Sequence, residues 1–212
     1  MIKGVIFDMD GVVIDSNHIH YEYWNSVFES ECQITIPKDD FARQLGRNPK
    51  DFVGYFKKVY DVDDRIIKKI EEKYKGFKHR IVLKPGFKTI IKELHGKYKI
   101  ALATGAARVN AIEHLERLGI MDYFDFIIGG DEVHEAKPHP EIFQKAASGL
   151  YLPPQDCVVI EDAELGIMAA IDAGIKVIAV YDDLTKDQDH SIADVKIESI
   201  HELIDTIKNI GG

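Results

Sequence analysis

Two aspartates near the N-terminus, Asp8 and Asp10, follow the apolar residues 5–7 and precede Gly11. In a β-strand, residues i and i+2 face the same side, so a strand that ends here directs both carboxylates to one point. Carboxylates this close repel each other unless a cation such as Mg²⁺ lies between them. One carboxylate can then act as a nucleophile while the other transfers protons. An ordinary turn, with Gly11 at a positive φ, is the alternative interpretation.

A second motif, Thr104-Gly105-Ala106, follows the apolar residues 99–103. It offers a hydroxyl and a series of backbone N–H groups just before a helix, an arrangement that binds phosphate. The alternative interpretation is a simple helix N-cap by Thr104.

Two charged motifs follow the next two apolar runs. Lys137 precedes a helix, and its ammonium group can serve there as a fixed cation, with a solvated surface lysine as the alternative. Glu161 and Asp162 end a buried strand, where two neighbouring acids are costly without a counter-ion. A metal ion shared with Asp8 explains them, and capping of the next helix is the alternative.

The elements that must position these residues alternate along the chain. The predicted strands comprise residues 4–7, 99–103, 126–129, 157–160 and 176–180, and the predicted helices comprise residues 108–118, 141–150, 166–173 and 199–210. This alternation predicts an α/β fold with a Rossmann-like parallel sheet and helices on both faces. Ligands bind at the C-terminal edge of such sheets, and all four motifs are expected at that edge.

One long segment, residues 15–83, interrupts the alternation. Its pattern predicts successive amphipathic helices and no strand. The predicted helices comprise residues 17–31, 37–45, 49–60 and 63–79. We expect an inserted all-α helical-bundle cap of residues 15–83 over an α/β catalytic core of residues 1–14 and 84–212. One continuous mixed domain is the alternative.

Composition favours a soluble protein of the cytoplasm. The net charge is −9 over 212 residues, which argues against binding to nucleic acid or to an anionic membrane. We find neither a signal-peptide pattern nor a run of about 18 apolar residues. The two cysteines, Cys32 and Cys157, match no metal-ligand spacing and are expected to be reduced. We further expect a monomer.

With these motifs in this order, the sequence resembles the haloacid dehalogenase-like superfamily, in the branch with a small helical cap that includes beta-phosphoglucomutase and phosphoglycolate phosphatase. Residues 8–16 match the first motif of the family, Thr104 the second, Lys137-Pro138 the third and Glu161-Asp162 the fourth. The resemblance covers residues 8–180. An aspartate two places after the predicted nucleophile favours phosphate chemistry over dehalogenation.

The resemblance implies a role for each core residue. Asp8 is the nucleophile that forms an aspartyl-phosphate, and Asp10 is the general acid and base. Mg²⁺ is held by Asp8, Asp10 and Asp162, with Glu161 placing a coordinated water. The phosphate oxygens are held by the side chains of Thr104 and Lys137 and by the N–H groups of Met9, Asp10, Gly105 and Ala106.

Selectivity is expected to come from the cap, which closes over the substrate and excludes water. Ser16, His20 and Trp24 are four residues apart, so they lie on one face of a helix and are candidate substrate contacts. Packing inside the cap is the alternative role for His20 and Trp24.

The loop of residues 45–50 resembles the cap loop that faces the active site in this branch, and it offers Arg47 and Lys50 as substrate contacts. Mutases have a cationic residue where this chain has Pro49, so a mutase is less favoured. We therefore expect a Mg²⁺-dependent phosphatase that hydrolyses a sugar phosphate or a small organic acid phosphate. The alternatives are a phosphomutase of the beta-phosphoglucomutase type and a non-catalytic protein that senses a phosphometabolite.

Overall fold

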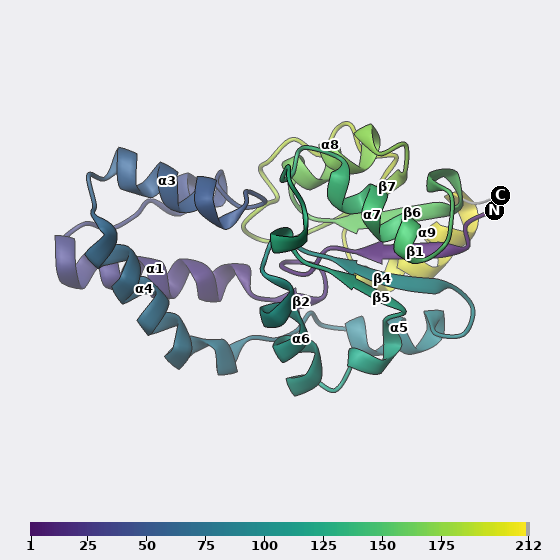
Figure 1. Cartoon of the computed structure of the whole chain (residues 1–212), viewed down its shortest axis with the longest axis horizontal. Helices are drawn as coiled ribbons and strands as arrows, with labels where there is room; N and C mark the ends of the chain where they lie inside the picture. The colour runs from purple at the N-terminus through teal and green to yellow at the C-terminus, as the bar shows by residue number, and fades with distance from the viewer. Residues whose placement is uncertain (211–212) are drawn as a thin grey trace.

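A computed structural model describes residues 1–210 of the chain. Its centre is a six-stranded parallel sheet in the order β5-β4-β1-β6-β7-β8 (Figure 1). The strands are β1 (Gly4–Phe7), β4 (Lys99–Ala103), β5 (Phe126–Ile128), β6 (Cys157–Glu161), β7 (Lys176–Val180) and β8 (Val195–Ile197). Because β1 pairs with β4 on one side and β6 on the other, the residues that follow these three strands come together at one edge.

Helices cover both faces of this sheet. They are α5 (Phe87–Leu94), α6 (Arg108–Arg117), α7 (Glu141–Gly149), α8 (Glu164–Asp172) and α9 (Leu203–Ile210), with short 3₁₀ helices at η2 (Met121–Tyr123), η3 (Gly130–Glu132), η4 (Pro154–Asp156) and η5 (Ile200–Glu202). Successive β1 residues face opposite sides, so Val5 and Phe7 join one buried cluster and Ile6 joins the other. The predicted α/β fold with a parallel sheet is confirmed.

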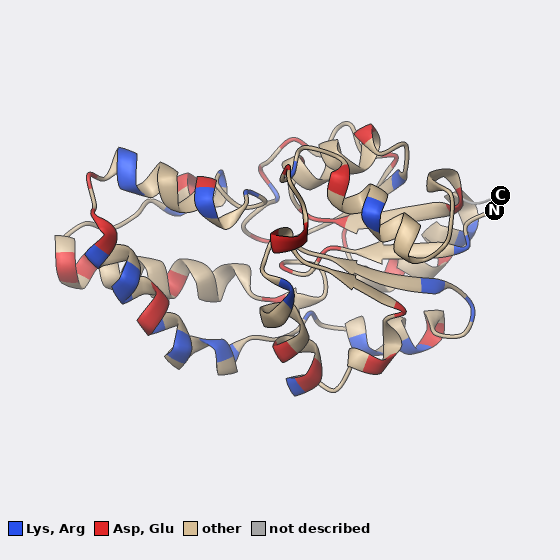
Figure 2. Cartoon of the chain, in the orientation of Figure 1, with Lys and Arg blue, Asp and Glu red and all other residues tan. Residues whose placement is uncertain are grey.

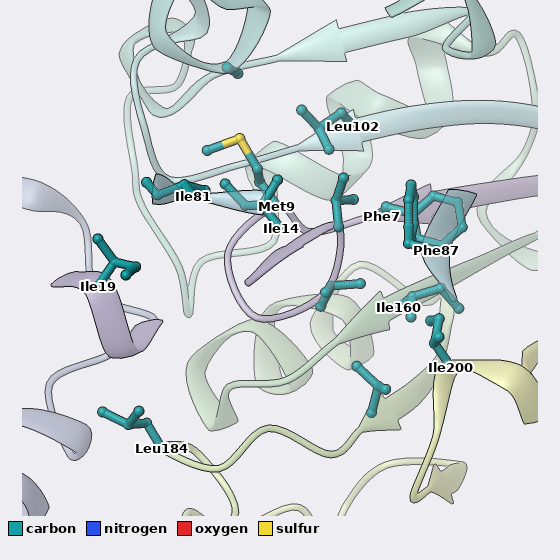
Figure 3. Close-up of a cluster of buried hydrophobic side chains, with 14 of the residues drawn as sticks. Phe7, Met9, Ile14, Ile19, Ile81, Phe87, Leu102, Ile160, Leu184 and Ile200 are labelled. Carbon is teal, nitrogen blue, oxygen red and sulfur yellow. The ribbon is translucent and has the colours of Figure 1, made fainter. Parts of the chain in front are cut away.

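The buried cluster beneath β1 is tightly interdigitated. Phe7 and Phe87 meet edge to face with their ring centroids 5.2 Å apart, and Leu102 and Ile160 from the neighbouring strands lie beside them (Figure 3). All four side chains are buried. Their packing holds β1, β4 and β6 in register with one another. It thereby positions the polar residues that follow the ends of these strands.

The segment between β2 (Ile14–Asp15) and β3 (Val82–Leu83) is helical and projects to one side of the sheet (Figure 1). It contains α1 (Asn17–Cys32), α2 (Lys38–Ala42), α3 (Pro49–Val59), α4 (Asp64–Phe77) and the 3₁₀ turn η1 (Lys78–Arg80). Aromatic packing holds these helices together, and Trp24 lies 4.9 Å from Phe56 and 5.0 Å from Phe52 between ring centroids. The helical cap is therefore present, while its domain boundaries stay predictions.

The prediction of no strand in this segment was wrong at its two ends. Ile14 pairs with Leu83, and Asp15 pairs with Val82, in a short antiparallel ribbon. Two residues are too few for an alternating pattern to show in a sequence. The pairing depends instead on the two ends of the segment meeting in space, so the helical segment leaves and rejoins the rest of the chain at one point.

Charged side chains are dispersed over the surface. In the view of Figure 2, lysine and arginine alternate with aspartate and glutamate along the helices. Over residues 1–210, the structure offers no helix with the length and apolar character that a membrane crossing requires.

Candidate active site

Residues from three parts of the chain meet at the C-terminal edge of the sheet. Asp8 follows β1, Glu161 ends β6, and Lys137 comes from the loop before α7. The Lys137 Nζ lies 2.6 Å from Asp8 Oδ1 and 2.7 Å from Glu161 Oε1, and all three side chains are buried. Lys137 is therefore a fixed internal cation and not a solvated surface lysine.

The acidic residues of this cluster fit a hard divalent cation. Oxygens of Asp8, Glu161 and Asp162 all lie within 4.8 Å of one another, and carboxylate oxygens are the ligands that Mg²⁺ prefers. Burial raises the pKa of Asp8 to about 8 although Lys137 lowers it, and burial also raises the pKa of Asp162 well above its ordinary value. One ammonium group thus leaves negative charge uncompensated, and a bound cation would offset it.

Glu161 has two functions in the structure. Its Oε1 accepts a hydrogen bond from Lys137, while its Oε2 accepts the N–H groups of Asp162 and Ala163, each at 2.8 Å. A Cβ on Gly166 would lie 1.6 Å from Glu161 Oε1, so only glycine lets α8 approach this carboxylate. Helix α8 begins at Glu164 without a side-chain cap, so the helix-capping interpretation of the acidic pair was wrong. The Glu161 carboxylate instead holds the turn before α8, and its place beside a metal ion stays a prediction.

Asp162 is held by residues that the sequence reasoning missed. Its Oδ2 accepts hydrogen bonds from Asn17 Nδ2 at 3.1 Å and from Thr185 Oγ1 at 3.0 Å. Asn17 also donates to Asp182 Oδ1 at 3.1 Å. Asp182 follows β7, so the rule that polar residues gather at strand ends could have found it. Asn17 and Thr185 carry no such signal, because only the folded chain brings them to Asp162.

Asp10 lies beside this cluster on the turn after β1. Ser16 Oγ donates to Asp10 Oδ1 at 2.5 Å, and His20 Nε2 lies 3.6 Å from the same oxygen. Burial acts to raise the pKa of Asp10, but the His20 and Ser16 contacts lower it below its ordinary value. The alternative interpretation of this motif as a turn is confirmed as well, because Gly11 has φ +78°. A Cβ at Gly11 would also lie only 2.2 Å from Asp162 Oδ2. The turn therefore brings the backbone of Gly11 against Asp162, while the Asp10 carboxylate lies outside the group of oxygens formed by Asp8, Glu161 and Asp162.

The Thr104 motif lies over the same edge. The buried Thr104 hydroxyl accepts the N–H of Ala106 at 3.1 Å, and Gly105 and Ala106 line the cavity described next. Helix α6 begins at Arg108 with Ala107 as its N-cap residue. The interpretation of Thr104 as a simple helix N-cap was therefore wrong, and its hydroxyl instead shapes the loop before α6.

A cavity of about 380 Å³ opens over these groups and extends between the helices of the cap. The predicted contacts that line it are Asp8, Asp10, His20, Trp24, Arg47, Gly105, Ala106, Lys137, Glu161 and Asp162. Ser16 is fully buried behind Asp10. Lys50 lines a neighbouring cavity of about 850 Å³, so its role as a substrate contact stays a prediction. Trp24 both lines the cavity and packs in the cap.

The cap loop is fastened to the core near this cavity. Gln188, in the loop after β7, donates from Nε2 to the Ala42 carbonyl at 2.8 Å. Its Oε1 accepts the N–H of Glu164 at the start of α8, also at 2.8 Å. The same nitrogen lies 3.4 Å from the carbonyl oxygen of Leu45, the first residue of the cap loop. One side chain thus ties the end of α2 and the start of the cap loop to the helix that follows the acidic pair.

The loop that carries Lys137 is fastened by Glu141, the first residue of α7. Glu141 Oε2 accepts the N–H groups of His134 at 3.0 Å and Glu135 at 2.9 Å, and Oε1 pairs with Lys145 at 2.6 Å. The hydrogen bond from Lys145, followed by those from the two N–H groups, lowers the pKa of Glu141 to about 2. The ionised carboxylate therefore stabilises this loop.

Replacing Glu141 with glutamine is expected to lower stability near neutral pH and to matter less in acid. A lowered folded-state pKa gives stabilisation that is present above the ordinary value of 4.5 and is lost as the pH falls towards 2. Urea unfolding of both proteins from pH 7 to pH 3 measures this. Glu116→Gln, at an exposed position on α6, is the matched control. A difference that stays constant over this pH range would contradict the expectation.

Comparison with known proteins agrees with this geometry. The family model described as haloacid dehalogenase-like hydrolase matches residues 5–180. A phosphorylated carbohydrates phosphatase of Thermotoga maritima is 32% identical, over 82% of this chain and 83% of its own length. The beta-phosphoglucomutase of Bacillus subtilis is 32% identical, over 84% of this chain and 83% of its own.

A solved structure, CbbY from Rhodobacter sphaeroides in complex with phosphate, superposes with a TM-score of 0.82 at 27% identity and covers 96% of each chain. The relatives and the shared fold confirm the predicted class of enzyme, a phosphatase-type hydrolase. The chain belongs to the haloacid dehalogenase-like hydrolase family.

Proposed function

We propose that this protein is a Mg²⁺-dependent phosphatase that hydrolyses a small phosphorylated metabolite through an aspartyl-phosphate on Asp8. The observation that carries the proposal is the buried cluster of Asp8, Lys137, Glu161 and Asp162 at the floor of a cavity. A phosphorylated carbohydrates phosphatase and a phosphate-bound structure among the similar proteins support it.

In this mechanism Asp8 attacks the phosphorus, and the bond from phosphorus to the alcohol oxygen breaks. The negative charge of a bound phosphate group would raise the low pKa of Asp10, so that Asp10 can give a proton to the departing alcohol. Asp10 then takes a proton from water, which attacks the phosphorus and releases phosphate from Asp8. Lys137, the Thr104 hydroxyl and the N–H of Gly105 bind the phosphoryl oxygens as charge spreads over them. The Ser16 hydroxyl and His20 orient the Asp10 carboxyl group.

Asp8, Asp162 and the Asp10 backbone carbonyl would hold Mg²⁺, with Glu161 orienting a coordinated water. The bound cation would neutralise phosphoryl oxygens so that the Asp8 carboxylate can approach. A cytoplasmic location and a monomeric state stay predictions of the sequence.

The second candidate is a phosphomutase, which the similarity to the Bacillus subtilis beta-phosphoglucomutase favours. Pro49, at the position where mutases have a cationic residue, favours the phosphatase. Phosphate release and sugar 1-phosphate to 6-phosphate conversion should be measured together, with Mg²⁺ and a catalytic amount of sugar bisphosphate. We expect phosphate release to dominate, and isomerisation faster than release would replace the proposal with the mutase.

Asp162→Asn is expected to weaken Mg²⁺ binding about 10- to 100-fold. The amide keeps an oxygen that can accept from Asn17 and Thr185, but it removes the negative charge that a cation requires. Calorimetric titration with Mg²⁺ and the Mg²⁺ dependence of turnover measure the change. Asp187→Asn, in an exposed loop, is the control, and an unchanged dissociation constant for Asp162→Asn would remove this residue from the metal site.

A further inference from the structure

The cavity above the catalytic carboxylates has a largely apolar wall on the cap side. Helix α3 contributes Phe52 and Val53, and helix α4 contributes Ile67, Ile70 and Tyr74. The α4 residues are three and four positions apart, so they form one stripe along the helix. This part of the cavity is therefore bounded by two helices that present hydrocarbon surface to its interior.

Several polar groups in the same wall are already paired with protein atoms. The Tyr23 hydroxyl lies 3.0 Å from His20 Nδ1, and the Tyr74 hydroxyl lies 2.8 Å from His114 Nε2. The amide nitrogen of Asn17 is shared between two carboxylates. These groups are engaged, so a ligand could use them only by displacing an existing partner.

Few side chains in the wall are left to recognise hydroxyl groups. Within residues 1–210, the lining residues Arg47, Glu71 and Asn110 make no side-chain hydrogen bond or ion pair. The Arg47 carbonyl lies 4.0 Å from the position of a Cβ on Gly105, so the backbone of Arg47 is next to the proposed phosphoryl site. Glu71 lies in the α4 stripe, and its negative charge together with the positive charge of Arg47 leaves these two side chains without net attraction for a second phosphate or a carboxylate.

These contacts decide which kind of alcohol fits. Each hydroxyl of a sugar ring needs a hydrogen-bond partner once water is excluded, and an unpaired buried hydroxyl weakens binding. A hydrocarbon ring needs no hydrogen-bond partner, and its binding is strengthened by apolar contact with Phe52, Val53 and Ile70. The wall thus suits an apolar group better than a polyhydroxylated one.

We infer that the substrate is the phosphate monoester of an apolar alcohol, aromatic or aliphatic, whose hydrocarbon part lies between α3 and α4. This inference rests on the proposed function and narrows its substrate class. Hexose phosphates are then the poorer substrates.

A matched pair of substrates tests the inference directly. Cyclohexylmethyl phosphate and glucose 6-phosphate both have a six-membered ring joined to phosphate through a CH₂–O group, and they differ mainly in ring polarity. We expect kcat/KM to be at least about tenfold higher for cyclohexylmethyl phosphate. Acetyl phosphate, too small to reach the α3–α4 wall, reports on the catalytic core alone.

A matched pair of variants locates the effect. Val53→Thr places a hydroxyl in the cavity wall with little change in shape, whereas Val59→Thr alters an exposed position on the same helix. We expect Val53→Thr to lower kcat/KM for cyclohexylmethyl phosphate about fivefold more than it lowers kcat/KM for acetyl phosphate. Val59→Thr is expected to change neither, and thermal unfolding shows whether both variants fold.

The outcomes separate the inference from the proposed function. If acetyl phosphate is hydrolysed but glucose 6-phosphate matches or exceeds cyclohexylmethyl phosphate, the inference is wrong and the phosphatase proposal stands. If Val53→Thr changes kcat/KM for cyclohexylmethyl phosphate and for acetyl phosphate by the same factor, the inference is also overturned. If no phosphate is released from any of the three compounds, the proposed function fails and the inference fails with it.

Discussion

Asp8→Asn is expected to lower kcat by at least about 10⁴-fold while the protein stays folded. The amide has nearly the shape of the carboxylate but is not nucleophilic, and losing a catalytic nucleophile has effects of this size. The site tolerates a neutral side chain, because burial already raises the pKa of Asp8 to about 8. Asp122→Asn, at an exposed position, is the matched control.

Acid quenching during turnover of a ³²P-labelled substrate provides a second measurement. Wild-type protein should retain covalent label, and Asp8→Asn should retain none, because no other carboxylate is proposed to attack phosphorus. Circular dichroism and thermal unfolding would show that the variant is folded. Turnover within tenfold of the wild type, or a label that persists in the variant, would contradict the role of Asp8.

Lys137→Met is expected to lower the free energy of unfolding by about 3–5 kcal/mol at neutral pH. Methionine fills a similar volume, but the ammonium group that lies 2.6 Å from Asp8 and 2.7 Å from Glu161 is lost. Asp8 and Glu161 then lie buried without a cation beside them, and the pKa of Asp8 rises further because the group that lowered it is gone. Turnover should also decrease about 10²- to 10³-fold, because a positive charge at the phosphoryl oxygens is removed.

The pH dependence of this loss follows from the pKa of Asp8. A carboxyl group whose folded-state pKa is raised from 3.8 to about 8 contributes stability below about pH 4 that is lost as the pH rises through 8. Lys137 lowers this pKa, so in Lys137→Met the pKa of Asp8 lies above 8. The cost of the substitution should therefore be larger at pH 9 than at pH 6, where Asp8 is protonated in both folded proteins. Urea unfolding at both pH values measures it, with the exposed Lys88→Met as control. A loss of equal size at both would contradict this account.

The sequence predicted the elements that depend on long apolar runs. Strands β1, β4 and β7 begin and end at the predicted residues, because each is buried on both faces and reads as continuous hydrocarbon. The polar residues after these runs then had to converge at one edge. The fold and the acidic core of the site were for this reason predictable without any spatial information.

The sequence analysis did not predict α5, although its apolar pattern was present, or β8, which is too short to give a pattern. Helix α5 carries apolar residues at the positions of an amphipathic helix, Phe87, Ile90, Ile91 and Leu94, so its pattern was present in the sequence. Strand β8 has three residues at the sheet edge, too few to distinguish from a loop. The residues that hold Asp162 were missed for a different reason. Asn17 is separated from Asp162 by 145 positions in the sequence, so only the folded chain shows that the two side chains are hydrogen-bonded.

The ribbon of β2 and β3 has a consequence for how such a protein can diversify. Because Ile14 pairs with Leu83 and Asp15 with Val82, the helical segment is a closed loop whose ends are fixed beside each other. Lengthening a closed loop costs little free energy, since the entropy of closure grows only slowly with length. Insertions or exchanges between these two strands would leave the register of the main sheet unaltered. Substrate preference can thus be rebuilt in this segment as an exchangeable module while the acids at the sheet edge stay in place.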